Sequence, residues 1–177
     1  FKHTKVFRND VQAICDSLVY NTKDSCMTMY KDPIAWNTDR QILGEVIKVY
    51  LQDSTVREAH VIGQALSIEL MPDKKHYNQL SSKEITTYFV KGNVRRVVAS
   101  GNVKTIYYPV DDKDSTLQGL VYTETDTMKL YISPERKLQK IWTPKNESVM
   151  YPMTQIPPNK YKLPEFAWFD NLRPTGP

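Results

Sequence analysis

The sequence predicts an all-β fold made of repeated antiparallel strand pairs. Three segments follow one template, an alternating strand, a tight turn and a second strand, at residues 46–63, 84–101 and 127–143. β-Branched and aromatic residues are frequent in these segments, and such residues favour strands. No window carries the capped apolar stripe of an amphipathic helix. Repetition of this kind predicts stacked units that bury one shared core.

Alternation within each repeat predicts which face is buried. In the first strand, Ile47 and Val49 fall on one side, and Lys48 and Tyr50 fall on the other. The same parity holds in all three repeats, which predicts one continuous apolar surface. The second strands carry an extra residue between their apolar positions, and this spacing predicts a bulge in each of them.

The limits of the repeats are set by glycines and turn-forming residues. Gly63 and Gly101 fall in register, so we expect two of the repeats to end there. A fourth, weaker copy of the template occupies residues 15–30. We expect long turns or insertions at 71–75 and 109–116, where residues typical of turns gather.

The composition changes near residue 149. Residues 1–149 form the predicted β-domain, and residues 150–177 form a tail rich in proline and aromatic residues. Proline lacks the N–H group that a central strand needs, so we expect the tail to be an extended strap across the domain or against a partner. Because residue 1 is Phe and lies beside a strand-like run, we also expect strands of the domain before it.

The bulk composition narrows the classes of function. With 40% hydrophobic and 25% charged residues, the chain of 177 residues has the composition of an ordinary folded domain. No apolar stretch approaches the ~20 residues of a membrane-spanning helix. The net charge is +4, and the basic residues are scattered. This balance does not predict nucleic-acid binding, but it suits an anionic ligand such as a phosphorylated glycolipid.

We find no pattern typical of catalysis or metal binding. The three histidines have no second ligand at metal-site spacing, and the acidic run at 111–114 lies among turn-forming residues. A nucleophile elbow and a glycine-rich phosphate loop are also missing from the sequence. We therefore predict a non-enzymatic protein without metal or cofactor. The histidines are His3, His60 and His76.

The two cysteines are not expected to pair. In a hairpin with its turn at 21–24, Cys26 lies opposite Val19 and Cys15 lies four residues further along the strand. That offset is about 13 Å, whereas the Cα atoms of a disulfide lie within ~7 Å of each other. We predict two thiols with no bridge between them.

Several motifs along the chain resemble those of OstA-like proteins, a family related to the periplasmic lipopolysaccharide-transport bridge proteins of the LptA type. The motifs are CDSLVY at 15–20, KDPIAW at 31–36, VIGQA at 61–65, ASGNV at 99–103 and MYPMTQIPP at 150–158. The resemblance implies an open, folded-over β-jellyroll with an apolar groove for acyl chains. It also implies a place in the cell envelope, periplasmic or associated with the outer membrane.

The same resemblance implies partners and a site. Lipopolysaccharide or a related glycolipid is the expected ligand, and other lipopolysaccharide-transport proteins or further copies of the chain are expected to join by edge-strand pairing. The predicted apolar face supplies the groove lining, and Arg95 and Arg96 are the candidate phosphate contacts at its rim. The predicted lining comprises Ile47, Val49, Leu51, Ala59, Val61, Ile85, Phe89, Val97, Ala99, Met128, Leu130, Ile132 and Ile141.

Other interpretations of these residues stay open. Inward apolar side chains are also what a closed β-sandwich core contains, so the alternative is a structural module with a dry core that binds proteins through open β-edges. Arg95 and Arg96, near Lys91 and Tyr88, are also compatible with the wet face of a strand or a basic–aromatic platform for nucleic acid. Small inward residues such as Ala59 and Ala99 leave room for a lipid chain.

Overall fold

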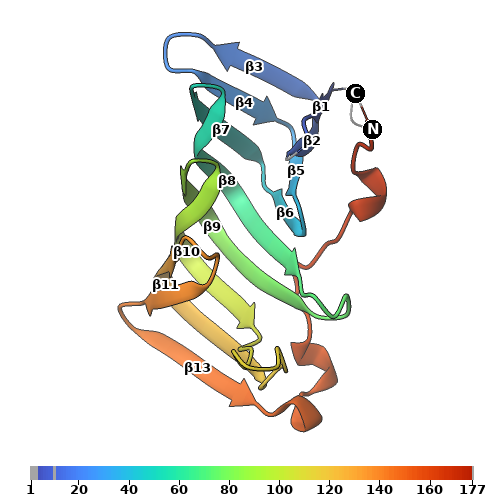
Figure 1. The fold of residues 1–177 in the computed structure, drawn as a ribbon, viewed down its shortest axis with the longest axis vertical. Helices are drawn as coiled ribbons and strands as arrows, with labels where there is room; N and C mark the ends of the chain where they lie inside the picture. Colours follow the sequence, from blue (N-terminus) through green and yellow to red (C-terminus); the bar gives the residue numbers. More distant parts are fainter. Residues whose placement is uncertain (1–3, 10, 177) are drawn as a thin grey trace.

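The computed structural model describes residues 4–9 and 11–176, and the chain forms one 13-stranded antiparallel sheet. The all-β prediction is confirmed (Figure 1). The strands are β1 (Thr4–Phe7), β2 (Gln12–Cys15), β3 (Ser17–Asn21), β4 (Cys26–Tyr30), β5 (Ile34–Asn37), β6 (Arg40–Leu43), β7 (Val46–Gln52), β8 (Thr55–Leu70), β9 (Tyr77–Val90), β10 (Asn93–Tyr107), β11 (Leu120–Ile132), β12 (Leu138–Trp142) and β13 (Asn146–Tyr151).

Three short 3-10 helices follow the last strand. They are η1 (Met153–Gln155), η2 (Pro158–Lys160) and η3 (Asp170–Leu172). In the part of the chain that the structure describes, no helix is long and apolar enough to cross a membrane. Strand β13 continues to Tyr151, past the boundary that composition suggested at residue 149.

The long strands β8 to β11 each contribute to two halves of the sheet, which we call wall A and wall B. Wall A contains β3, β4, β7, β12 and residues 55–62, 84–90, 93–100 and 127–132. Wall B contains β1, β2, β5, β6, β13 and residues 65–70, 77–82, 103–107 and 120–125. The apolar cores of both walls merge, because buried residues of one wall pack with those of the other.

The strands bend between the walls at residues with positive φ. Gly63 and Gln64 have φ values of 82° and 44°, and Gly101 and Asn102 have 84° and 56°. The strand register shifts at the same places, between Ile62 and Ala65 and between Ser100 and Val103. The expectation that the repeats end at Gly63 and Gly101 was therefore wrong. These glycines mark the bends, and the strands continue beyond them.

The predicted bulges are confirmed in all three second strands. The register shifts between Tyr50 and Leu51, between Val94 and Arg96, and between Tyr131 and Ile132. The extra residues at these shifts are Arg57, Arg95 and Gln139. A bulge bends and twists its strand, so each repeat curves at the same place near its turn.

The buried core lies between the walls, close to the bends. Ile47 and Val61 of wall A and Ala65 and Val103 of wall B are all 0–1% exposed. The cysteines contribute to different walls, since Cys15 lies on β2 and Cys26 lies on β4, and both thiols are buried.

The residues after β13 lie as a strap on the outer face of wall B. In Figure 1 the strap runs from β13 back along the sheet toward the N-terminal strands. It covers two apolar clusters, one around Ile106, Tyr108 and Leu120 and another around Ile14 and Trp36. Wall B is thus buried on both faces, which explains why its central strands carry long runs of buried residues.

Three buried glutamines of wall B hold the strap, two through its backbone and one through an arginine side chain. Gln79 Nε2 donates to the backbone carbonyl oxygen of Tyr161 (2.9 Å), and Gln79 Oε1 accepts from the backbone N–H of Leu163 (2.8 Å). In the same way, Gln41 Nε2 donates to the backbone carbonyl oxygen of Ala167 (2.8 Å), and Gln41 Oε1 accepts from the backbone N–H of Phe169 (2.7 Å). Gln12 accepts from Arg173 Nε at 2.7 Å.

These glutamines share one cross-strand row on the outer face. The row alternates polar and apolar side chains, so the carboxamides reach the strap while the apolar residues fill the space beneath it. In order across the sheet, it reads Gln12, Trp36, Gln41, Ile68, Gln79, Ile106 and Tyr122.

Substitution of Gly101 by Ala is expected to destabilise the domain. At φ +84° an added Cβ would lie 2.7 Å from Lys83 Cδ. Left-handed backbone with a side chain costs about 1–3 kcal/mol, and we expect a loss of that size in the free energy of urea unfolding. Gly176→Ala is the matched control, because nothing lies within 4 Å of its Cβ position. Equal unfolding midpoints for both variants would contradict the role of Gly101 as a bend.

Candidate functional site

Strand register places all of the predicted lining residues on one face of wall A. They fall into three cross-strand rows that run parallel to the bend. The row nearest the bend holds Ile47, Val61, Ile85, Ala99 and Met128. The middle row holds Val49, Ala59, Val97, Leu130 and Ile141. The outermost row is formed by Leu51, Phe89 and Ile132, each two residues beyond a position of the middle row on its own strand.

Burial falls from the bend outward. The row nearest the bend is 1–4% exposed, whereas most of the middle and outermost rows are half-buried. Ile141, on the edge strand β12, is 48% exposed. The accessible part of this face is called the apolar margin. It consists of Val49, Leu51, Phe89, Leu130, Ile132 and Ile141.

The opposing surface belongs to wall B and was not predicted. Its apolar end is formed by Ala13, Ala35 and Ile42, which share one row across β2, β5 and β6. The same row becomes hydroxylated toward β13, through Ser67, Leu80, Thr105, Thr123 and Ser148. Thr123 and Ser148 are hydrogen-bonded at 2.9 Å. The interior therefore changes from apolar to weakly polar along its length.

The two ends of the interior differ in how the walls are connected, and both expose part of the inner face. At the N-terminal end, Arg8, which follows β1 of wall B, donates to the backbone carbonyl oxygen of Ser54 in the β7–β8 turn of wall A at 3.1 Å, so a contact bridges the walls there. At the other end, β12 and β13 pair separately with β11. On the inner face at this end, Ile141 and Met150 are 48% and 55% exposed. The inner face is also accessible at the β3 end, where Tyr20, in one row with Met27 and Val49, is 49% exposed.

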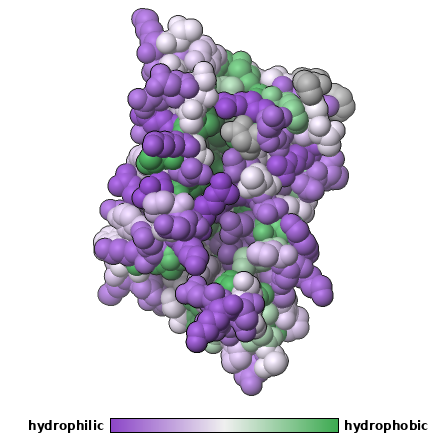
Figure 2. All heavy atoms as spheres, in the orientation of Figure 1, coloured by the Kyte–Doolittle hydropathy of each residue, from purple (hydrophilic) through white to green (hydrophobic). Residues whose placement is uncertain are grey.

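The visible surface is otherwise hydrophilic. In Figure 2, hydrophilic side chains cover most of the face in view, and hydrophobic atoms appear in strips between them. An apolar face that is largely turned inward accounts for this distribution, because its side chains pack between the walls.

Comparison with known proteins identifies the architecture. No family model matches the sequence, and no curated protein matches it. Among solved structures, the chain is similar to the crystal structure of LptH, the LptA-homologous periplasmic component of the lipopolysaccharide transport device of Pseudomonas aeruginosa. The similarity has a TM-score of 0.58 at 14% identity and covers 80% of this chain and 95% of LptH.

The chain has the LptA-like fold. The predicted folded-over β-jellyroll is thereby confirmed. The bend at Gly63 and Gly101 is the local feature that produces the two walls of this fold. About a fifth of the chain lies outside the match, since the match covers 80% of it.

Within the LptA-like fold, Arg96 does not lie on the side of the predicted lining. Its guanidinium lies 4.1 Å from the ring centroid of Tyr88, and it is in register with Tyr88 and Tyr131 on the outer face. The expectation that Arg96 lies at the rim of the lined face was therefore wrong, because strand alternation directs its side chain to the outer face. Arg95 is the bulge residue, and its Nε donates to the Ile132 oxygen at 3.0 Å.

The isolated histidines and acids take structural roles. His60 contacts Glu58 at 2.9 Å on the outer face, and His76 bonds Asp73 within the β8–β9 turn. Asp111 and Asp114 accept backbone N–H bonds in their loop, as expected of turn formers. Among the described residues, no group of three or more His, Cys, Asp or Glu could hold a metal. His3 lies outside the described residues.

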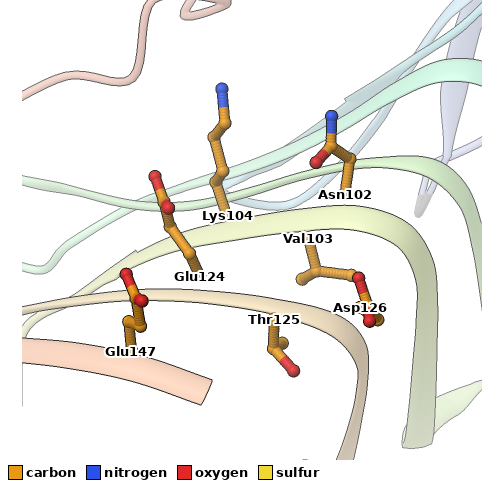
Figure 3. A pocket seen from close by; sticks show the side chains of 7 residues that line it. All are labelled: Asn102, Val103, Lys104, Glu124, Thr125, Asp126 and Glu147. Carbon is orange, nitrogen blue, oxygen red and sulfur yellow. The ribbon is translucent and has the colours of Figure 1, made fainter. Parts of the chain in front are cut away.

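Two hollows lie away from the apolar margin. One, of about 250 Å³, sits at the bend of β10 and β11, and its lining includes three carboxylates and one lysine. Figure 3 shows Lys104, Glu124 and Glu147 projecting to one side of their strands and Val103 and Thr125 to the other. The other hollow, of about 340 Å³, lies beside Ile34 and Phe169 at the end of the strap.

Tyr108 gives the strap region a measurable alkaline dependence. Burial raises the pKa of its phenol from an ordinary value near 10 to about 12. The folded state therefore favours the neutral phenol, so this stabilisation is complete below pH ~10 and is lost as the pH rises toward ~12. We expect the wild type to lose more unfolding free energy than Tyr108→Phe between about pH 8 and about pH 11. Tyr20→Phe, at a position 49% exposed, should behave as the wild type. Identical losses for Tyr108→Phe and wild type would contradict the assignment.

Proposed function

We propose that this chain is a non-catalytic carrier of lipopolysaccharide or a related glycolipid in the periplasm. The acyl chains would lie against the inner face of wall A and enter through the apolar margin. The observation that carries this proposal is the graded burial of that face, from a packed row at the bend to accessible side chains such as Leu130 and Ile141. The structural similarity to a periplasmic component of a lipopolysaccharide transport device supports it.

The energetics of such binding need no polar contact with the acyl chains. Each methylene group removed from water contributes ~0.8 kcal/mol, so several chains together give tight binding. Transfer along the face requires no bond chemistry, and the proposal includes no cofactor or catalytic residue. Arg95, at the bulge beside the outermost row, is the candidate contact for a lipid phosphate.

Neighbouring components would join through the sheet edges. Strands β12 and β13 each pair only with β11 among the described strands, so each leaves one backbone edge for strand addition. Pairing there would extend the apolar face into a further copy or another transport protein with the same architecture. An outer-membrane association of the chain would follow from such pairing.

A second function is favoured by the tight packing at the bend. Residues of both walls there are 0–4% exposed, which is also the property of a closed core. In that case the chain would be a structural module that binds proteins through its edges, with a dry interior. Association that depends on protein concentration, without any uptake of lipid, would favour this alternative.

The test is site-specific photocrosslinking at two adjacent positions of β11. The photoreactive residue p-benzoylphenylalanine replaces either Leu130, on the inner face, or Tyr131, on the outer face. After irradiation with dephosphorylated lipopolysaccharide, which keeps its acyl chains but lacks the phosphates that a basic surface could hold, we expect an adduct at position 130 and little or none at position 131. Equal labelling at both positions, or none at 130, would reject the groove.

The phosphate contact is tested separately. Arg95→Gln is expected to weaken binding of phosphorylated lipopolysaccharide and to leave binding of the dephosphorylated lipid unchanged. Equal effects on both lipids would assign Arg95 a structural role, through its bond to the Ile132 oxygen.

A further inference from the structure

The outer faces of the two walls differ in what covers them. The strap bonds to wall B, through Gln12, Gln41 and Gln79. The strap also packs on the two apolar clusters of wall B, around Tyr108 and around Trp36. The outer face of wall A instead carries a mixture of basic and aromatic side chains, and the proposed acyl-binding face lies on the opposite side of its strands.

Two cross-strand rows make up this basic–aromatic face. The alternation that sends the lining residues inward sends these side chains outward. One row reads Lys48, His60, Thr86, Val98, Lys129 and Trp142. The other reads Tyr50, Glu58, Tyr88, Arg96, Tyr131 and Lys140. The rows cross six strands, a width of about 24 Å at ~4.8 Å per strand.

The basic groups on this face lie over aromatic rings. The Arg96 guanidinium is 4.1 Å from the Tyr88 centroid, and the Lys129 ammonium is 4.9 Å from that of Trp142. Lys140 lies 5.6 Å from the Tyr131 centroid. Within the described chain, none of these three cations has a carboxylate within ion-pair distance.

The positive charge of the face is therefore not neutralised by the chain itself. Arg57 does pair with Glu58 at 3.1 Å, while Arg96, Lys129 and Lys140 keep their charge available to an outside anion. The cation–π contacts hold these side chains along the sheet instead of extending them into solvent. The result is a broad, positively charged face with aromatic rings between the cations.

We propose that the outer face of wall A docks on a surface of anionic lipid headgroups. Phosphate groups would contact Arg96, Lys129 and Lys140, and Tyr88, Tyr131 and Trp142 would lie at headgroup level. Aromatic side chains with one polar tip, next to long basic side chains, suit the boundary between water and lipid. Trp142, on the edge strand β12, is 41% exposed and therefore available to such a surface.

The partner is assigned from charge complementarity and from the shape of the face. An extended sheet face presents its cations over an area, which matches an array of phosphates better than one compact anion. Each basic residue near an anionic surface contributes about fivefold in binding, so the three cations together contribute about a hundredfold. The attraction is screened by salt.

The experiment measures co-sedimentation of the full chain with vesicles. The anionic vesicles contain about one third phosphatidylglycerol in phosphatidylcholine, and the neutral vesicles contain phosphatidylcholine alone. We expect the wild type to bind the anionic vesicles, to release them at high salt, and not to bind the neutral ones. Absence of binding to the anionic vesicles, or equal binding to both, would overturn the proposal.

Two variants with equal loss of charge distinguish binding through this face from attraction by the net charge of the protein. The first triple variant, Arg96→Gln/Lys129→Gln/Lys140→Gln, should lower the affinity for anionic vesicles about a hundredfold. The control triple variant, Lys5→Gln/Lys75→Gln/Lys113→Gln, removes the same charge from exposed positions of other elements. It should change the affinity less than about threefold. Equal losses in both variants would overturn the proposal. Circular dichroism and urea unfolding check that both variants fold.

A last arm distinguishes lipid headgroups from other phosphate-bearing polymers. A single-stranded oligothymidylate that bound the same face as tightly as the vesicles would overturn the lipid assignment in favour of nucleic acid. Because these side chains face away from the apolar margin, Leu130→Arg should leave vesicle binding unchanged. A failure of the groove and a failure of this face are therefore observed independently.

Discussion

Replacing Gln41 with Ala is expected to lower the free energy of unfolding by about 2–4 kcal/mol, since each unsatisfied buried polar group costs about 1–3 kcal/mol. Gln41 is 0% exposed, and its carboxamide bonds the Ala167 oxygen and the Phe169 nitrogen of the strap. Without it, both strap groups lose their partner, and the apolar cluster around Trp36 loses its cover.

The measurement is urea unfolding of the full chain. Gln118→Ala, at an exposed loop position, is the control and should change stability by less than about 0.5 kcal/mol. Gln79→Ala should resemble Gln41→Ala, and the double variant should cost less than the sum, because either change loosens the same strap. Strict additivity, or a Gln41→Ala effect as small as the control, would contradict this account of the strap.

Replacing Leu130 with Arg is expected to abolish lipopolysaccharide binding while the domain stays folded. Leu130 is half-buried in the apolar margin and lies opposite the exposed Ile141. An arginine there can extend its charged end toward water, so folding survives. Its charge nevertheless lies in the path of the acyl chains, and desolvating it would cost several kcal/mol.

Tyr131→Arg is the matched control for this variant. It adds the same charge to the adjacent residue of the same strand, on the outer face. We expect Tyr131→Arg to bind lipopolysaccharide with an affinity within about threefold of the wild type. Leu130→Arg should bind at least about a hundredfold more weakly, which corresponds to a loss of about 2.7 kcal/mol or more from the desolvated charge. Equal affinities would place the acyl chains elsewhere.

Strand parity was the most informative property of the sequence. Alternation at residues 47–51 and its copies predicted the inner face of wall A, and register brings every predicted lining residue to that face. The extra residue in each second strand correctly predicted a bulge at Arg57, Arg95 and Gln139. Both features depend on local sequence, which is why sequence alone predicts them.

The bends and the second wall could not be predicted in the same way. A glycine with positive φ is equally compatible with the end of a strand and with a kink inside it, so Gly63 and Gly101 were misassigned. The apolar end of the inner face of wall B comes from strands of four residues, namely β2, β5 and β6. Such short runs show too little alternation to identify a face.

The glutamine contacts with the strap depend on long-range pairing. Gln79, Gln41 and Gln12 bond residues 82, 126 and 161 positions away. In the sequence they are polar residues within strand-like runs, which suggests a solvent-exposed face. Their burial becomes evident only when the strap is in place.

The most direct test of the central claim is native mass spectrometry of the delipidated chain with purified lipopolysaccharide. We expect a stoichiometric complex whose yield saturates with lipid, and we expect Leu130→Arg to form none. A folded chain that forms no complex at high lipid excess, or forms the same complex with Leu130→Arg, would contradict an acyl-binding face on wall A. It would favour the structural module with a dry core.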